Sequence, residues 1–171
     1  MRALTAVLFL GSFAVAADVE SRQLTHYVPQ DLLEAAVRKE GWTEVPLALK
    51  GGVRKGDVVR VWAGGSIDRG NGDQPGENVG GPQGVGPAKG NFALSADHAF
   101  ALLFKTDSAG PTTCRPAGQP REIKIAKDGE KVWVGFNDEK GRYADNHLGR
   151  GQRHELDPLW VRVEVVRTTV D

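Results

Sequence analysis

Short oxygen-bearing side chains gather in one stretch of the chain, FNDEKGRYADNHLG at positions 136–149. Calcium takes about six to eight oxygen ligands, drawn from carboxylates, amides and main-chain carbonyls. The stretch offers all three kinds. Its candidate donors are the carboxylates of Asp138 and Asp145, the amide of Asn146 and the main-chain carbonyl of Arg142. These residues form a candidate site for a hard divalent cation.

The same composition is also typical of an ordinary polar turn, in which Asp and Asn side chains bond to their own backbone. The residues by themselves leave both interpretations open. Zinc and copper are disfavoured here, because the stretch contains no cysteine and only one histidine, His147.

Runs with the composition of β-strands flank this stretch. Their β-branched and aromatic residues mostly alternate with polar ones, at 45–50, 57–63, 100–106, 121–126, 131–137 and 159–166. Val161, Val163 and Val165 fall on one face of the last run, which predicts a core side. Asp128-Gly129 is a good hairpin turn between two runs. The spacing predicts a β-sandwich, and parallel βαβ units are not expected because only one helix is available.

That helix is expected near the N-terminus, within HYVPQDLLEAAVRKEGW at 26–42. Leu32, Leu33, Ala36 and Val37 fall on one helical face, and Gly41 is a stop signal. Core packing is the expected role of the four tryptophans, Trp42, Trp62, Trp133 and Trp160.

The first 17 residues have the pattern of a signal peptide. Met1-Arg2 supplies a positive start, an apolar run follows to Val15, and small residues stand near Ala16 and Ala17. The run is shorter than the roughly 20 residues that a membrane-spanning helix needs. We therefore expect a secreted or periplasmic protein with no transmembrane segment in the mature chain.

Charge and reactive side chains restrict the function further. Lys plus Arg and Asp plus Glu number 22 each, and no basic stripe is present, so a nucleic-acid partner is not expected. The lone Cys114 lacks a disulfide partner and stands in a loop sequence without a group to activate it. No nucleophile motif accompanies the isolated histidines, so catalysis is not expected; they are His26, His98, His147 and His154.

Glycine dominates positions 64–90 in the middle of the chain. Long loops in compact domains are usually binding loops or disordered segments. The composition leaves these two alternatives open.

Five pieces stand in order between Val45 and Val166: KGDVVRVWAGG, GPQG, DHAFALLFKTDSAG, VWVGFNDEKGRYADNHLG and VRVEV. In this order and spacing they resemble the PA-IL (LecA)-like family of calcium-dependent, galactose-binding bacterial lectins, with this chain as a distant relative. The resemblance implies a calcium ion held by Asp138, the Arg142 carbonyl, Asp145, Asn146 and, as a fifth ligand, the main-chain carbonyl of Asp68. It also implies that two sugar hydroxyls complete the calcium shell and contact the same carboxylate and amide side chains.

The chain departs from the family in the loop after GPQG. Galactose-binding members carry a His and a Gln there, whereas this chain has Ala88 and Asn91 with Lys89 between them. Asn91, Lys89 and His147 are the remaining expected ligand contacts. The expected carbohydrate is therefore galactose-like or another glycan.

We thus expect an all-β protein, a jelly-roll-like β-sandwich with one short N-terminal helix. Its expected parts are a signal peptide at 1–17, a helical extension at 18–44 and a lectin-like domain at 45–171. The expected function is calcium-dependent carbohydrate binding without catalysis, in a protein that can be an oligomer. Two alternatives stay open: an interaction module whose calcium is purely structural, and a glycan-processing enzyme, for which no pair of carboxylates stands out.

Overall fold

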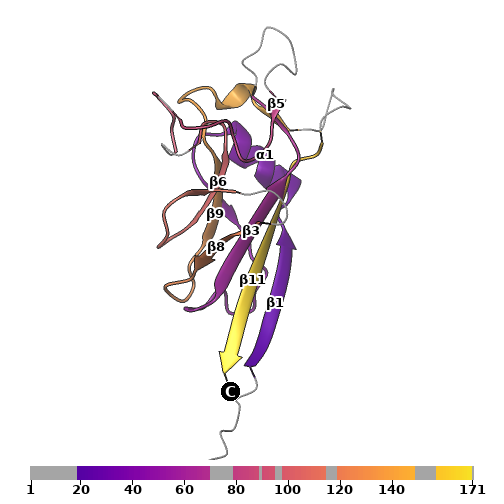
Figure 1. Ribbon diagram of the computed structural model, residues 1–171, viewed down its shortest axis with the longest axis vertical. Coiled ribbons are helices and arrows are strands. Elements are labelled where there is room, and N and C mark those ends of the chain that lie inside the picture. The colour runs from indigo at the N-terminus through magenta and orange to yellow at the C-terminus, as the bar shows by residue number, and fades with distance from the viewer. Residues whose placement is uncertain are drawn as a thin grey trace, which may run out of the picture.

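Two antiparallel sheets of four strands pack face to face, with a small third sheet at one end (Figure 1). This computed structural model describes residues 19–69, 79–88, 90–94, 98–114, 119–148 and 157–170. The expected signal peptide at 1–17 lies outside these residues. All strand pairings in the described part are antiparallel, so the all-β sandwich with one short α-helix is confirmed.

The first sheet has the order β1-β11-β3-β8, with bounds β1 Val19–Tyr27, β11 Trp160–Val170, β3 Val58–Gly64 and β8 Arg121–Lys124. As predicted, Val161, Val163 and Val165 of β11 face the core. β11 is longer than β3, and beyond Val166 it pairs with β1 alone. These two strands form the long ribbon that ends near the C-terminus in Figure 1.

The second sheet has the order β2-β9-β6-β7, and the small sheet has the order β10-β4-β5. The bounds in the second sheet are β2 Thr43–Val45, β9 Val132–Phe136, β6 Leu102–Thr106 and β7 Thr112–Thr113. Those in the small sheet are β10 His147–Leu148, β4 Ile67–Asp68 and β5 Val79–Gly80. β4 and β5 belong to the glycine-rich segment, so part of that segment is ordered into strands at the end where β10 lies.

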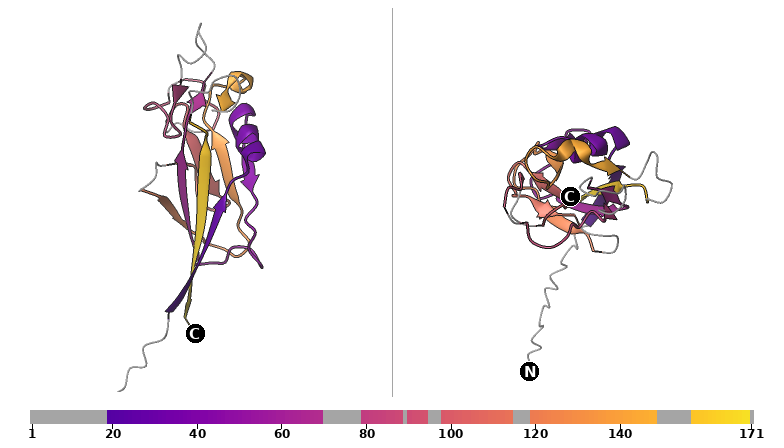
Figure 2. Two further views of the ribbon diagram at one scale, coloured as in Figure 1. Left: turned by 90° about the vertical axis from the view of Figure 1, so that its right-hand side faces the viewer. Right: turned by 90° about the horizontal axis from the view of Figure 1, so that it is seen from above.

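The helix α1 (Gln30–Arg38) confirms the predicted amphipathic element. It buries Leu33, Ala36 and Val37, and it contacts β9, β10 and β2 (Figure 2). These side chains join one apolar core with the inward residues of both sheets. Burying Leu33 and Val37 contributes roughly 1.5–3 kcal/mol each, which explains why this short helix is held against the sandwich.

Two local predictions need correction. The run 45–50 is not a strand, because Pro46 has no N–H for a ladder and β2 ends at Val45. Asp128-Gly129 does form a turn, but it joins strands of different sheets. Asp128 Oδ1 accepts a hydrogen bond from the Lys55 N–H at 2.7 Å, which ties the turn to the loop before β3.

The tryptophans also differ from expectation. None of the four belongs to the core cluster. Trp62 is buried, with the Arg162 guanidinium 4.1 Å from its ring centre, whereas Trp42, Trp133 and Trp160 are only partly buried. Trp133 alternates with the inward Val132 and Val134, so its indole faces outward and donates to Asp107 at 2.8 Å.

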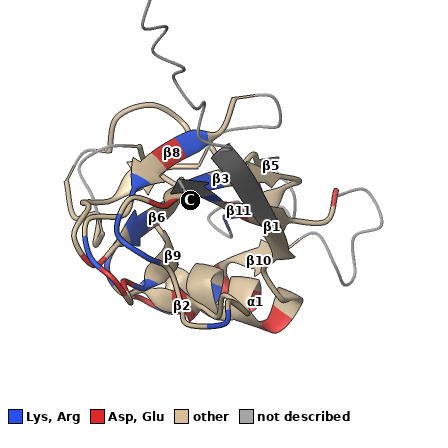
Figure 3. Ribbon diagram, turned by 90° about the horizontal axis from the view of Figure 1, so that it is seen from below, with Lys and Arg blue, Asp and Glu red and all other residues tan. Residues whose placement is uncertain are grey.

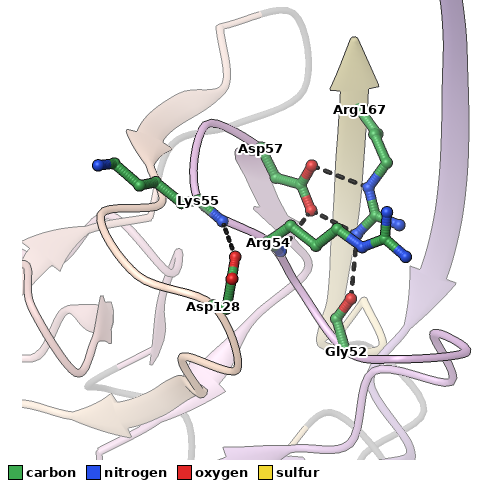
Figure 4. A network of polar contacts seen from close by, with 6 residues as sticks. All are labelled: Gly52, Arg54, Lys55, Asp57, Asp128 and Arg167. Carbon is green, nitrogen blue, oxygen red and sulfur yellow. Dashed lines mark hydrogen bonds and ion pairs between the residues drawn. The ribbon is translucent and has the colours of Figure 1, made fainter. Parts of the chain in front are cut away.

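A partly buried ion pair links β11 to the loop before β3 (Figure 4). The Arg167 guanidinium donates to both carboxylate oxygens of Asp57, at 3.0 and 2.7 Å, and to the Gly52 carbonyl at 3.0 Å. The Arg54 N–H donates to the same carboxylate at 2.8 Å. The C-terminal half of β11 is thereby fixed to the loop that precedes β3.

Acidic and basic residues are interspersed when the molecule is viewed from below (Figure 3). No helix in the described part of the chain is both long and apolar enough to cross a membrane.

Candidate functional site

The predicted cation loop connects β9 to β10 and contains the short 3-10 helix η1 (Tyr143–Asp145). Residues 91–94 run alongside it: the Ala93 N–H donates to the Asp138 carbonyl and the Lys140 N–H to the Asn91 carbonyl, both at 3.0 Å. β4 lies on the other side, where Asp68 is paired with His147. Three segments far apart in the sequence therefore meet at this loop.

Asp138 is fully buried at the end of β9. Its Oδ1 accepts a hydrogen bond from the Glu139 N–H and its Oδ2 one from the Asn146 side-chain amide, each at 2.6 Å. Both donors are neutral groups. Because a carboxylate has about four lone-pair positions, each oxygen keeps capacity for another partner.

Asn146 is also fully buried, and its side-chain amide has a fixed orientation. The Nδ2 group donates both to Asp138 and to the Val37 carbonyl in α1, at 2.6 and 3.1 Å. A flipped amide would place oxygen against two acceptors, so Oδ1 points away from them. The helix thus determines which atom of Asn146 remains available.

Two buried oxygens in the loop lack a hydrogen-bond donor among the described residues: Asn146 Oδ1 and Asp145 Oδ1. Leaving a buried acceptor unsatisfied costs about 1–3 kcal/mol, so native structures rarely tolerate two side by side in sequence. Both atoms are among the oxygens that the sequence assigns to a cation. The residues present therefore fit a hard, oxygen-binding ion.

Electrostatics at the loop favour an added positive charge. Burial raises the pKa of Asp138, the hydrogen bonds from Asn146 and Glu139 offset this in part, and the charge of Asp145 raises the pKa further. Asp138 and Asp145 are hence close enough to repel each other. Such a pair is costly to ionise without a nearby cation.

Arg69, directly after β4, brings one positive group near the loop. Burial lowers the pKa of its guanidinium, and the charges of Asp68 and Asp138 oppose that shift. The guanidinium lies 5.0 Å from the centre of the Phe100 ring. Its attraction is too weak to reverse the upward direction of the Asp138 pKa.

Tyr143 fixes the backbone of the loop and was not singled out by the sequence analysis. Its buried hydroxyl donates to the Phe136 carbonyl at 3.0 Å and accepts from the Asp138 N–H at 3.3 Å. Burial raises the pKa of Tyr143 to about 12, so the hydroxyl keeps its proton. The one sequence signal was a large aromatic residue within an otherwise polar, glycine-containing stretch.

The remaining predicted residues divide into three groups. Asp68 is buried in β4 and pairs with His147 at the end of the loop, and its role as a fifth ligand stays a prediction. Arg142 precedes η1 and Asn91 lies along the loop, both with exposed side chains. His147 is exposed and faces a pocket shared with α1. Lys89 lies outside the described residues.

No cluster of three or more His, Cys, Asp or Glu side chains suited to a metal occurs within the described ranges. A metal at the loop must therefore take amide and carbonyl oxygens besides its two carboxylates, which is the ligand chemistry of calcium rather than zinc. Cys114 offers no alternative centre, because it is fully buried and burial raises the pKa of its thiol.

Comparison with known proteins gives distant likeness only. No protein-family model matches the chain, and no curated protein matches it. Among solved structures, the chain is similar to one described as the EclA N-terminal domain, a PllA-like lectin, at 17% identity and a TM-score of 0.40. The match covers 84% of this chain and 94% of that one. A likeness at this level is too remote to assign a function.

Proposed function

We propose that this protein is a secreted, calcium-dependent carbohydrate-binding protein of the lectin type. The observation that carries the proposal is the pair of buried, donorless oxygens of Asp145 and Asn146 beside the buried carboxylate of Asp138. A calcium ion would satisfy these oxygens and offset the repulsion between the two carboxylates. The main-chain carbonyls of Arg142 and Asp68 are the proposed further ligands.

In this proposal, sugar hydroxyls replace water in the part of the calcium shell that the protein does not fill. Hydroxyl oxygens are hard ligands of the kind calcium binds, so the exchange with water costs little. Asn91 and His147 are the described candidates for contacts to the rest of the sugar, with Lys89 proposed beside them. The resemblance to calcium-dependent lectins supports this use of the loop, and the altered loop at Ala88 and Asn91 leaves the glycan unspecified.

A second candidate is a calcium that serves the structure alone. The complete burial of Asp138 and Asn146 favours it, because an ion held there would link β9, η1 and α1 without needing a ligand from solvent. Both candidate functions require bound calcium, but only the lectin also binds a sugar.

Calorimetric titration separates them. We expect calcium to bind the wild-type chain and the control Glu122→Gln, in which the removed carboxylate is exposed on β8. We expect no calcium binding by Asp138→Ala. A panel of monosaccharides is then titrated in calcium and in chelator. Sugar binding only in calcium supports the lectin, whereas calcium binding without any sugar supports the structural ion. Calcium binding by Asp138→Ala equal to wild type contradicts both.

A further inference from the structure

A pocket lies between α1 and β10, which are neighbours in Figure 3. Its volume is about 260 Å³, and its lining residues are Gln30, Glu34, Arg38, His147 and Leu148. Pockets for drug-sized ligands have volumes of about 300–1,000 Å³. This pocket therefore suits a ligand of the size of a single sugar ring.

One of the lining residues carries an unsatisfied polar atom. Gln30 Nε2 is buried and has no acceptor among the described residues. Buried amide groups are nearly always hydrogen-bonded, so Gln30 Nε2 would gain an acceptor if its side chain turned toward a ligand in the pocket. The residue stands at the first position of α1, which fixes its direction relative to the rest of the helix.

The charges of the pocket favour a neutral ligand with many hydroxyls. Glu34 and Arg38 form an ion pair at 3.2 Å, so their net charge is zero. The Glu34 carboxylate accepts hydrogen bonds, and the Arg38 guanidinium and the Gln30 amide donate them. The His147 imidazole can do either, and Leu148 forms an apolar wall. Hydroxyl groups donate and accept at once, whereas a charged ligand would compete with the existing ion pair.

We propose that this pocket is a second, calcium-independent binding site for a neutral polyhydroxylated molecule of about one sugar ring. It goes beyond the proposed lectin site, because none of its polar groups other than His147 belongs to the cation loop. Arg38 donates to the Ala144 carbonyl at 3.2 Å, so the helix that lines the pocket also holds the loop. Both sites therefore depend on the position of α1, but only the lectin site needs calcium.

The test uses the full chain in chelator, which removes calcium-dependent binding. Cyclic monosaccharides and linear alditols are titrated separately while amide and imidazole resonances are followed by NMR. We expect saturable shifts at the Gln30 side-chain amide and His147, with a Kd on the order of 1 mM, because a small ligand makes few contacts. Binding of rings alone or of alditols alone identifies which source of hydroxyls fits.

Gln30→Leu should weaken this binding at least tenfold. The variant removes an unsatisfied buried amide, so it should keep the wild-type melting temperature. Glu34→Gln is a second variant that keeps the shape of the pocket and should weaken binding as well. The matched control is Asp31→Asn, an exposed position on the same helix outside the pocket, which should bind as wild type.

The outcomes are distinct from those for the lectin site. Absence of saturable binding in chelator at ligand concentrations well above 1 mM overturns the proposal, as does binding that Gln30→Leu and Glu34→Gln leave unchanged. Binding that appears only with calcium also overturns it, while leaving the lectin site supported. Failure of calcium to bind would remove the lectin site and leave this pocket untouched.

Discussion

Two buried carboxylates lie in contrasting surroundings in this molecule. Asp57 is enclosed by the Arg167 guanidinium and the Arg54 N–H, whereas Asp138 receives hydrogen bonds from a side-chain amide and a backbone N–H. Burial acts to raise the pKa of Asp57, but the bonds from Arg167 and Arg54 outweigh it, and the pKa is lowered. Burial raises the pKa of Asp138, and its neutral donors do not reverse this.

The difference shows what each site is suited for. At Asp57 the protein supplies its own cation, so the carboxylate is a structural link between β11 and the loop before β3 (Figure 4). At Asp138 the protein supplies no such cation, and the unsatisfied oxygens of Asp145 and Asn146 in the same loop would also be stabilised by a bound cation. A carboxylate that is buried without full compensation is a candidate for function rather than for stability.

Breaking the Asp57 pair should have the largest effect. Asp57→Ala leaves the Arg167 guanidinium without its partner, and the cost should be about 3 kcal/mol, the lower end of the range for buried pairs, because the Arg167 side chain is 17% exposed. Urea denaturation of Asp57→Ala, Arg167→Ala and the double variant measures the free energy of unfolding and the coupling between the two residues. A cost below about 1 kcal/mol would place the pair among ordinary surface ion pairs.

Calcium should stabilise the chain through Asp138 and not through Asp57. At free calcium about one hundred times the Kd, the free energy of unfolding should rise by about 2.7 kcal/mol. Thermal denaturation should show this gain in the wild type and in Asp57→Asn, and lose it in Asp138→Asn. In chelator, Asp138→Asn should itself cost about 1–3 kcal/mol, because its NH2 group would face one of the two buried donors that the carboxylate accepts from, the Glu139 N–H or Asn146 Nδ2. If calcium stabilised Asp138→Asn as much as the wild type, Asp138 would not be a calcium ligand, and the proposed difference between Asp57 and Asp138 would be wrong.

Acid should weaken the Asp57 link. Its pKa in the folded chain lies below the unfolded value of 3.8, so the unfolded chain binds more protons in this range and stability rises with pH. The contribution is complete above pH 3.8 and is lost as the pH falls through the lowered pKa. Denaturation midpoints measured from pH 5 downward should fall less steeply in Asp57→Asn than in the wild type. Equal slopes would show that this carboxylate is not the group that titrates.

The Tyr143 hydroxyl should have the smallest effect of the four. Tyr143→Phe removes its bonds to the Phe136 carbonyl and the Asp138 N–H, and it should lower the free energy of unfolding by about 1 kcal/mol. Calcium affinity should fall as well, since the Asp138 backbone is less firmly held. Tyr27→Phe is the control, because Tyr27 is 60% exposed and should show neither change.

Sequence patterns with a regular period were sufficient for much of the fold. The alternation in β11 and the helical spacing of Leu33, Ala36 and Val37 identified the inward side chains correctly. The strand β1 was not expected, although it pairs with β11 along its whole length. Its partner lies more than a hundred residues away, and pairing at that distance leaves no local signal in either strand.

The turn at Asp128-Gly129 and the outward Trp133 show a second limit. Local composition identified a turn and a strand, but it did not specify which sheet each strand joins or which face of β9 is covered. Both depend on contacts with distant segments, such as the bond from Lys55 to Asp128.

By itself, the sequence determined the oxygen-rich loop, its candidate ligands and the alternating strands on either side of it. These follow from residue type and short spacing, which are local properties of the chain. Tertiary structure alone decided that the Val37 carbonyl orients the Asn146 amide and that Asp57 finds Arg167 while Asp138 is left with neutral donors. The physical reason is that burial and charge compensation depend on which distant groups the fold brings within hydrogen-bonding distance.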